Sequence, residues 1–337
     1  MHHATMKAAF LDAPRQLTIR TVPIPEPRAG EVRVRLSRVG ICGSDVHLFL
    51  GHRPLAQPTI IGHEGYGYID ALGDGVTTRR AGERVVIEPN IPCMHCRFCR
   101  QGRGNICLNK RVVGLTEAGC FAEYICLPEA FCWPVPDAVS TADAVCVEPT
   151  AVSLHALSLS SARPGDAIAI VGLGAIGLLL SHVALRLGYR VLVSELNAVK
   201  RQQAVREGAI AVAGDAPALN AIWEAHEVVA VFECAGSAGT ASLVTAAAPR
   251  GAEIILVGLS EQPAQFTPLR MAREGISLIP SIIYRHPTDF RRTLDLIARQ
   301  TITPSAIISG TYPLDRLQSA FEQAITGHES KLIVDID

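Results

Sequence analysis

Hydrophobic and polar positions alternate along the first part of the chain. The segment 30–42 (GEVRVRLSRVGIC) alternates before a turn at Gly43, and 65–76 (GYGYIDALGDGV) and 81–89 (AGERVVIEP) are short stretches with Gly and Asp at their turns. A period of two with frequent turn residues is typical of short β-strands. Segment 119–131 adds another alternating strand. We therefore expect a barrel-like β domain in the N-terminal part.

The pattern changes near residue 140, where helical and strand-like segments begin to alternate. This alternation over roughly 120 residues predicts a doubly wound parallel sheet. Two amphipathic segments and an apolar strand follow near the C-terminus. The expected helices are 141–160, 178–188, 197–208, 288–300 and 314–327, and the expected strands are 167–171, 190–195, 227–236, 251–259 and 330–337.

Length and composition limit the class of protein. A chain of 337 residues is long enough for two domains, and 48% hydrophobic with 19% charged residues is a globular composition. The net charge of −1 and the lack of a basic block argue against nucleic acid or an anionic membrane surface as partner. Segment 167–185 is uncharged and long enough to span a bilayer, but Gly172, Gly174 and Gly177 break it. We expect a strand, a glycine turn and a buried helix there.

Four of the ten cysteines lie in the segment 92–107 (PCMHCRFCRQGRGNIC), with the spacing C-x2-C-x2-C-x7-C. The N-terminus has no signal-peptide layout, so we expect a cytoplasmic protein whose thiols stay reduced. Four thiolates at short spacing suit a tetrahedral zinc ion better than disulfides or a single redox pair. Four protein ligands leave no open coordination position, which predicts a structural zinc site. The predicted ligands are Cys93, Cys96, Cys99 and Cys107.

Gly172, Gly174 and Gly177 form a G-x-G-x-x-G pattern between an expected strand and an expected helix. This context is typical of a dinucleotide-binding turn, where the helix N-terminus faces a pyrophosphate. Glu195 follows 18 residues after Gly177 and suits the ribose hydroxyls of the adenosine. Its charge favours NAD over NADP, although the nearby Lys200 and Arg201 keep NADP open.

A second metal site is suggested by scattered residues. Cys42, the pair His63–Glu64 and Glu148 together offer the three protein ligands and the open position that catalytic zinc requires. Each residue alone has a simpler explanation, such as a core cysteine or a surface pair. Because the candidate ligands lie far apart in the sequence, their spacing does not decide between these interpretations.

The order of these motifs resembles the zinc-dependent medium-chain dehydrogenases. Besides the cysteine segment and the glycine turn, residues 62–76 match that family's pattern G-H-E-x-x-G-x5-G-x-x-V, and the likeness extends over nearly the whole chain from Met6. The resemblance implies a GroES-like β-barrel catalytic domain and a Rossmann NAD-binding domain, assembled as a homodimer or homotetramer. The expected limits are 1–150 for the catalytic domain, 151–285 for the Rossmann domain and 286–337 for a C-terminal return to the catalytic domain.

Within that family the chain is most similar to the sorbitol, or polyol, dehydrogenase branch, through CGSDVH at Cys42–His47 and VEPTAV around Glu148. The resemblance implies a catalytic zinc at Cys42 and His63, with Glu64 and Glu148 as direct or water-mediated ligands. It also implies a proton relay through Ser44 and His47. The segment YRHPTDF places Arg285 at the substrate, with His286 where the branch usually has tyrosine, and Arg53 is a further candidate. The predicted cofactor contacts are Gly172, Gly174, Ala175, Ile176, Gly177, Glu195, Lys200, Cys234, Ala235, Gly236, Val257 and Gly258.

The resemblance thus implies an enzyme with two zinc ions per subunit that transfers a hydride from a secondary alcohol of a polyol or sugar derivative to NAD. If both Arg285 and Arg53 face the substrate, a sugar acid becomes the alternative substrate, followed by an activity like that of L-threonine 3-dehydrogenase. A non-catalytic dinucleotide-binding relative and a zinc-free quinone reductase are more distant alternatives, because the zinc ligand set is intact.

Overall fold

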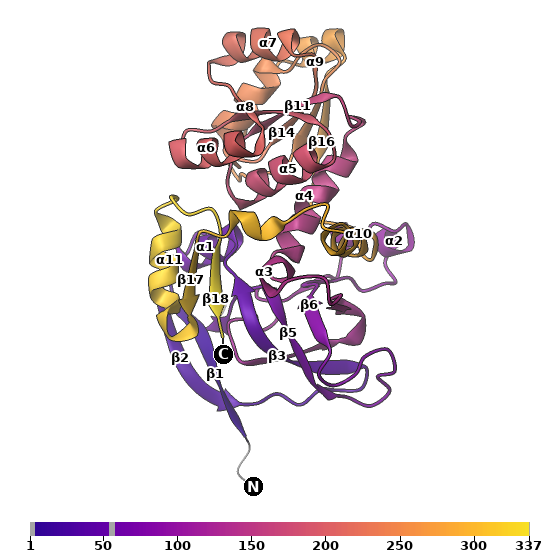
Figure 1. The fold of residues 1–337 in the computed structure, drawn as a ribbon, viewed down its shortest axis with the longest axis vertical. Coiled ribbons are helices and arrows are strands. Elements are labelled where there is room, and N and C mark those ends of the chain that lie inside the picture. The colour runs from indigo at the N-terminus through magenta and orange to yellow at the C-terminus, as the bar shows by residue number, and fades with distance from the viewer. Residues whose placement is uncertain (1–3, 54–57, 337) are drawn as a thin grey trace. The chain divides into compact units, whose positions relative to one another are not determined.

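The computed structural model describes residues 4–53 and 58–336. It divides into two compact units, each described separately below (Figure 1). The chain passes between the units several times, so that neither unit is continuous in sequence. Unit 1 comprises Met1–Glu148, Arg285–Arg299 and Ser305–Asp337, and unit 2 comprises Pro149–Tyr284 and Gln300–Pro304.

Unit 1 is built from β-sheets, as the alternating pattern predicts. Its largest sheet has the strand order β10-β6-β5-β3-β18-β17, with β9 also paired to β3, and two smaller sheets have the orders β2-β1-β4 and β7-β8. The strands are β1 Thr5–Ala13, β2 Gln16–Pro23, β3 Glu31–Gly40, β4 Thr59–Ile60, β5 Glu64–Leu72, β6 Arg84–Ile87, β7 Asn90–Ile91, β8 Arg111–Val112, β9 Tyr124–Pro128, β10 Cys132–Pro134, β17 Gly310–Pro313 and β18 Leu332–Asp335.

Strand β3 holds this sheet together. Val32, Val34 and Leu36 alternate with more exposed residues and are buried in the core, as expected for a strand with one face inside. β3 pairs antiparallel with β5, β9 and β18. The last pairing brings the C-terminal part of the chain, which follows unit 2 in sequence, into the sheet of the N-terminal part. The expected final strand is therefore part of unit 1.

Short helices complete unit 1. They are α1 Gly43–Phe49, α2 Arg97–Arg100, α3 Thr141–Ala144, α10 Thr288–Ala298 and α11 Leu317–Ile325, with 3-10 turns at Gly104–Ile106, Glu129–Phe131, Pro304–Ile307 and Leu314–Arg316. The single helix expected over 141–160 is instead two, α3 and α4 (Val147–Leu159). Pro149 explains the break, because proline lacks an N–H and its ring clashes with the carbonyl four residues earlier.

Unit 2 contains a six-stranded parallel sheet with the order β13-β12-β11-β14-β15-β16. All five residues of β11 are buried, as the apolar segment 167–171 predicts for a strand covered on both faces. The sequence did not indicate β13 or β16 at the two edges. The strands are β11 Ala167–Val171, β12 Arg190–Ser194, β13 Ile210–Ala211, β14 Val228–Glu233, β15 Glu253–Leu256 and β16 Ser277–Pro280, and the helices are α5 Ala175–Arg186, α6 Ala198–Glu207, α7 Ala216–Ala225, α8 Ala238–Ala247 and α9 Pro268–Glu274.

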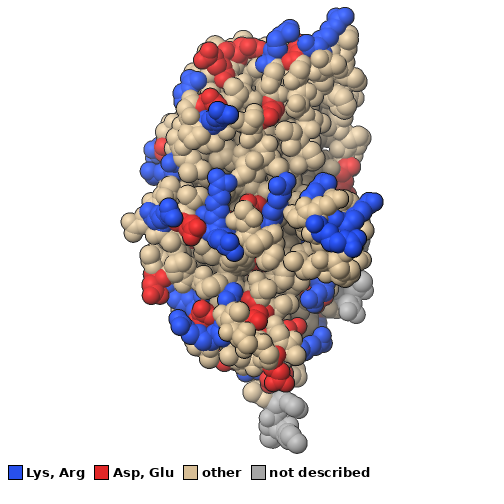
Figure 2. Space-filling view, turned by 90° about the vertical axis from the view of Figure 1, so that its right-hand side faces the viewer, with Lys and Arg blue, Asp and Glu red and all other residues tan. Residues whose placement is uncertain are grey.

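The surface and helix lengths agree with the composition. On the face shown in Figure 2, acidic and basic side chains are both present among broad uncharged areas. Across the described residues, every helix is too short or too polar to cross a membrane. The uncharged segment 167–185 is divided between β11 and α5, with Gly172 and Gly174 in the turn, as expected.

Candidate active site with two metal clusters

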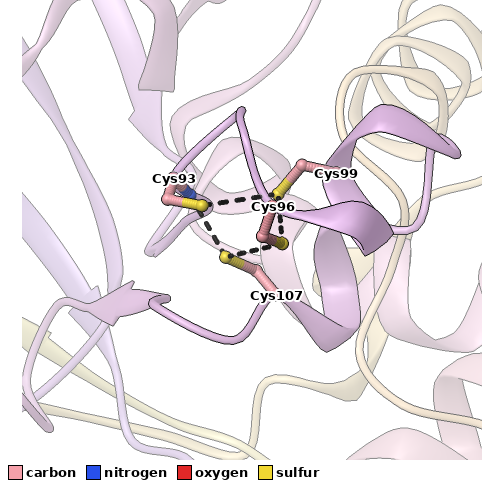
Figure 3. A group of neighbouring side chains, drawn as sticks. All are labelled: Cys93, Cys96, Cys99 and Cys107. Carbon is pink, nitrogen blue, oxygen red and sulfur yellow. Dashed lines mark hydrogen bonds between the residues drawn. The ribbon is translucent and has the colours of Figure 1, made fainter.

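The four cysteines of segment 92–107 converge on one point (Figure 3). Their sulfur atoms all lie within 4.8 Å of one another. Backbone N–H groups also point at them, since Cys93 N lies 3.2 Å and Asn109 N lies 3.3 Å from Sγ of Cys107. Hydrogen bonds from the backbone of Cys99 and Leu108 lower the pKa of Cys96 to about 6. This set of thiolate donors fits a tetrahedral zinc ion with no open position.

A second cluster consists of Cys42, His63 and Glu64, whose ligand atoms also lie within 4.8 Å of one another. Sheet pairing brings them together, because Gly40 at the end of β3 is opposite Glu64 at the start of β5. Cys42 then follows β3 at the N-cap of α1. His63 and Glu64 are buried, whereas Cys42 is partly exposed. Three ligands from protein leave a fourth position for water or substrate, as in catalytic zinc sites.

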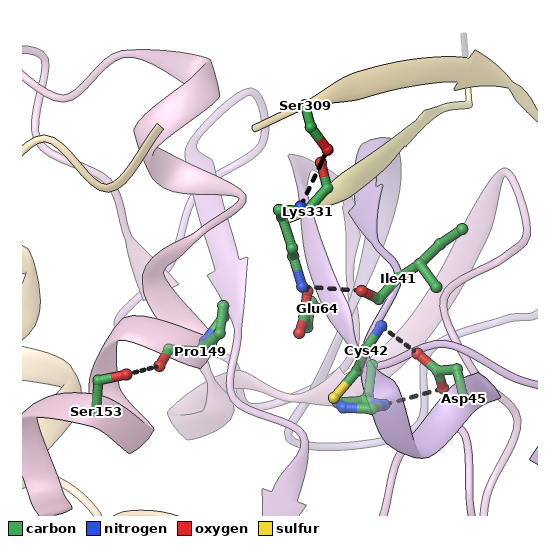
Figure 4. A network of polar contacts seen from close by, with 9 residues as sticks. Ile41, Cys42, Asp45, Glu64, Pro149, Ser153, Ser309 and Lys331 are labelled. Carbon is green, nitrogen blue, oxygen red and sulfur yellow. Dashed lines mark hydrogen bonds and ion pairs between the residues drawn. The ribbon is translucent and has the colours of Figure 1, made fainter. Parts of the chain in front are cut away.

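Asp45 orients two of these ligands, a role that the sequence analysis did not predict. Its carboxylate is fully buried and accepts a hydrogen bond from Cys42 N at 3.0 Å (Figure 4). It also lies 3.2 Å from Nδ1 of His63. Nε2 of His63 therefore remains for a metal. Burial alone lowers the pKa of His63, but the charges of Asp45 and Cys42 outweigh it and raise that pKa well above its usual value. The negative surroundings suit a cation.

Lys331 is the second contributor that sequence reasoning missed. Its Nζ forms a buried ion pair with Glu64 and donates to Ile41 O at 3.0 Å (Figure 4). The other carboxylate oxygen of Glu64, Oε1, is buried and has no hydrogen-bond partner within the described residues. Gly40 makes room for this arrangement, since a Cβ there would lie 2.0 Å from Glu64 Oε2. In the sequence, the role of Lys331 was indicated only by the presence of a lysine in the apolar segment 330–337 (SKLIVDID).

Glu148 is buried near this cluster but is not one of the three residues whose ligand atoms are grouped together. Glu148 lies in the first turn of α4 and is 7% exposed. Burial raises its pKa to about 7, opposed by the charge of His63. The group of three ligand atoms within 4.8 Å does not include its carboxylate. Its contact with zinc stays a prediction.

The predicted relay and substrate residues of unit 1 are exposed, except for Ser44. Ser44 is partly buried on α1, while His47 is exposed and its Nδ1 lies 3.1 Å from Nδ1 of His52. Arg53 and Arg285 are both exposed. The backbone N–H of Arg285 donates to Asp289 at 2.8 Å at the start of α10. The roles of these residues remain predictions.

In unit 2 the glycine turn has the packing that its three positions require. A Cβ at Gly172 would lie 2.6 Å from Ala235 N, and one at Gly177 would lie 2.0 Å from Gly172 O. A Cβ at Gly174 would meet nothing within 4 Å. Gly174 is the N-cap of α5. The first and third glycines therefore allow close backbone contacts, while the second borders open space at the position where the sequence predicts a pyrophosphate.

The other predicted cofactor residues lie at the carboxyl ends of the parallel strands, the edge where ligands bind in such sheets. Glu195 follows β12, and its carboxylate accepts hydrogen bonds from Leu173 N at 2.6 Å and Asn197 N at 2.7 Å. Glu233 ends β14 and accepts from the N–H groups of Ala235 and Gly236 at 3.0 Å. Its backbone oxygen accepts from Val257 and Gly258 at 2.9 and 2.8 Å. Lys200 is buried on α6, Ala175 and Ile176 begin α5 after the glycine turn, and Cys234 follows β14.

Comparison with known proteins identifies the family. Residues 28–137 match the alcohol dehydrogenase GroES-like domain, and residues 175–299 match the zinc-binding dehydrogenase family. Sorbitol dehydrogenase of Bacillus subtilis (strain 168) is 30% identical over 95% of this chain and 94% of its own length. The alcohol dehydrogenase rspB of Escherichia coli CFT073, complexed with NADH, has a TM-score of 0.92 at 28% identity, covering 98% of this chain and 99% of that one.

A solved structure that contains NADP is about as similar to this chain. A zinc-binding dehydrogenase from Sinorhizobium meliloti 1021, bound to NADP, has a TM-score of 0.91 at 31% identity and covers 99% of this chain and 100% of its own. Together these matches confirm the expected fold class, a GroES-like domain with a six-stranded parallel Rossmann sheet.

Proposed function

Because the chain belongs to the zinc-dependent medium-chain dehydrogenases, and is thus an NAD(P)-dependent oxidoreductase of the alcohol and polyol dehydrogenase family, we propose that it oxidises a secondary alcohol of a polyol or sugar derivative to a ketone with NAD. The observation that carries the proposal is the cluster of Cys42, His63 and Glu64, in which His63 and Glu64 are buried and Glu148 is nearby. Carboxylates can hold both a metal and neighbouring hydroxyl groups.

We assign the chain's residues the following parts in this reaction. Cys42, His63 and a carboxylate from Glu64 or Glu148 hold the catalytic zinc, and the four cysteines of segment 92–107 hold a structural zinc. When bound, zinc would supply Lewis acidity toward the substrate oxygen, and NAD would supply the hydride acceptor. Ser44 receives the alcohol proton and passes it toward His47. The 3.1 Å contact between His47 and His52 extends this relay toward solvent.

We propose NAD as the cofactor in preference to NADP. The carboxylate of Glu195 is held rigidly by two backbone N–H groups after β12. A fixed carboxylate accepts hydrogen bonds from ribose hydroxyls and repels a 2′-phosphate. Arg201, the nearest basic candidate for binding that phosphate, donates to the backbone oxygen of Glu195 at 2.7 Å. The relatives include both NADH and NADP complexes, so the preference is a property of this chain's own residues.

A substrate screen with NAD and with NADP tests the function directly. The panel contains neutral polyols, aldonates, L-threonine and simple secondary alcohols. We expect reduction of NAD with at least one neutral polyol, at a higher kcat/KM than for any aldonate. Absence of turnover across the panel would contradict the proposal and favour a dinucleotide-binding relative without catalysis. A clear preference for aldonates would instead support the sugar-acid alternative, which the exposed Arg53 and Arg285 favour.

We also propose a homodimer formed through β16. This strand is the edge of the parallel sheet in unit 2, and Leu278 on it is 40% exposed. An exposed apolar edge offers unpaired N–H and C=O groups for pairing with a second copy. Leu278→Lys should therefore shift the mass measured by light scattering toward the monomer, and an unchanged mass would contradict this interface.

A cytoplasmic location is consistent with the ten free cysteines.

A further inference from the structure

His47 and His52 lie side by side on unit 1, outside both metal clusters. Their Nδ1 atoms are 3.1 Å apart, and their ring centroids are 5.4 Å apart with the ring planes tilted by 48°. Both residues are exposed. A hydrogen bond between exposed groups adds little stability, because water offers the same bonds to each ring. The backbone around the pair therefore has to explain why the rings meet.

The C-terminal end of α1 holds the two histidines together. His52 N donates to His47 O at 3.0 Å, and Gly51 N donates to Leu48 O at 2.9 Å. Gly51 has a φ of 77°. These two bonds and the left-handed glycine form a Schellman motif, in which the side chain after the glycine contacts a side chain of the last helical turn. That contact is commonly apolar, but here both positions are histidine.

The turn is also fixed from outside the helix. Pro14, in the hairpin between β1 and β2, packs against Gly51 so closely that a Cβ on this glycine would lie 2.6 Å from Pro14 Cγ. The backbone N–H of Arg15 in the same hairpin donates to Phe49 O at 2.6 Å. The backbone positions of His47 and His52 are thus set by the fold, while their rings remain accessible.

Two imidazole nitrogens at this separation can bind one metal ion. Nitrogens that each lie about 2.1 Å from a zinc ion are about 3.0–3.4 Å apart at bond angles of about 90–110°. The rings of His47 and His52 meet edge to edge, so an ion would lie beside the line that joins the two Nδ1 atoms. A small rotation of both rings, which exposed side chains undergo readily, directs the two lone pairs to that point. Imidazole suits Zn2+, Ni2+ and Cu2+ and not the hard cation Mg2+.

The number of ligands sets this pair apart from the two clusters. Over residues 4–53 and 58–336, no third His, Cys, Asp or Glu joins His47 and His52 in a ligand group. The closed cluster offers four protein ligands and the open cluster three. With two protein ligands, the remaining coordination positions go to water. Such an ion exchanges with solution, unlike a resident structural or catalytic ion.

We propose that His47 and His52 form a third metal site, which binds a divalent transition-metal ion reversibly and thereby inhibits the enzyme. The inhibition rests on the proposed function, in which His47 passes the alcohol proton toward solvent. A metal-bound Nδ1 no longer accepts a proton, so the ion interrupts this transfer. Cys42 at the other end of α1 is five residues away, about 7.5 Å along the helix axis. The ion therefore acts without displacing the catalytic zinc.

Calorimetric titration of the zinc-loaded protein with NiCl2 tests the site. We expect the wild type to bind about one Ni2+ per chain in addition to its zinc. His47→Gln and His52→Gln should each weaken this binding at least about 10-fold, because one of the two protein ligands is lost. His328→Gln is the matched control, since this exposed histidine lies outside the pair. MgCl2 is the control ion, and zinc content and melting temperature confirm that the clusters and the fold are unchanged.

Turnover with and without saturating NiCl2 tests the inhibition. The ion should slow the wild type at least about 10-fold, because a positioned proton-transfer group contributes about 100-fold or more. Dilution should restore the rate. Equal Ni2+ affinity in the wild type and both pair variants would overturn the site, and binding without loss of turnover would overturn its inhibitory role. A wild type that oxidises no alcohol would overturn the proposed function, while the titration would still decide the metal site.

Discussion

The two metal clusters of unit 1 differ in how the chain forms them. The closed cluster takes all four ligands from the segment 92–107, whereas the open cluster takes Cys42 from the end of β3 and His63–Glu64 from the start of β5. The closed cluster is complete in itself. The open cluster depends on Asp45 and on Lys331, which is 267 residues away from Glu64 in the sequence. A local site thus stabilises its own segment, and a dispersed site depends on the whole sheet.

Cys42→Ser should separate the two clusters most strongly. We expect turnover to fall about 1,000-fold or more, because Lewis acidity at the substrate oxygen contributes several kcal/mol to the barrier. Zinc content should fall from about two ions per chain to about one, with little change in melting temperature. Steady-state kinetics and metal analysis on the same sample check both. Full activity in this variant would contradict the assignment of the open cluster.

Cys99→Ser should have the opposite profile. Losing the closed zinc should lower the free energy of unfolding on the order of 4 kcal/mol, because metal binding there is coupled to folding. The kcat per folded molecule should stay near the wild-type value. Cys126→Ser is the matched control, since this partly exposed thiol belongs to neither cluster. An unchanged melting temperature together with unchanged zinc content would refute a structural role for the closed cluster.

Lys331→Met tests whether the open cluster depends on the distant end of the chain. Removing the buried cation leaves Glu64 without its partner, which should cost about 3 kcal/mol of stability. Lys7→Met is the control, because the pair of Lys7 with Asp315 is exposed and should matter by less than about 1 kcal/mol. Urea unfolding of both variants gives the comparison. Equal effects would show that Lys331 behaves like a surface lysine.

Asp45→Asn should give the smallest effect, and one confined to the open cluster. The amide no longer holds Nδ1 of His63 as a carboxylate does, so zinc affinity there should fall about 10- to 100-fold. Competition with a chelator should release one zinc ion earlier than in the wild type and the second at an unchanged concentration. Simultaneous release of both ions would mean that the variant disturbs the fold instead.

Much of the fold could be predicted because its signals are local. Alternation in 30–42 marks β3, and the apolar run 167–171 followed by glycines marks β11 and its turn. Edge strands β13 and β16 were missed, because β13 has only two residues and β16 is mostly exposed and lacks a buried apolar run. The helix break before α4 depends on Pro149, whose effect the apolar pattern of 141–160 concealed.

The sequence by itself determined the two features whose parts are close neighbours in the chain. These are the closed cluster of segment 92–107 and the glycine turn. In the first, a short stretch of backbone sets the distance between the ligands, and in the second it sets the distance between strand and helix. Only the tertiary structure decided which distant groups meet. Asp45 beside His63, Lys331 beside Glu64, and Glu88 beside His286 all follow from strand pairing and helix packing. Such contacts depend on register across a sheet, and spacing along the chain does not encode that register.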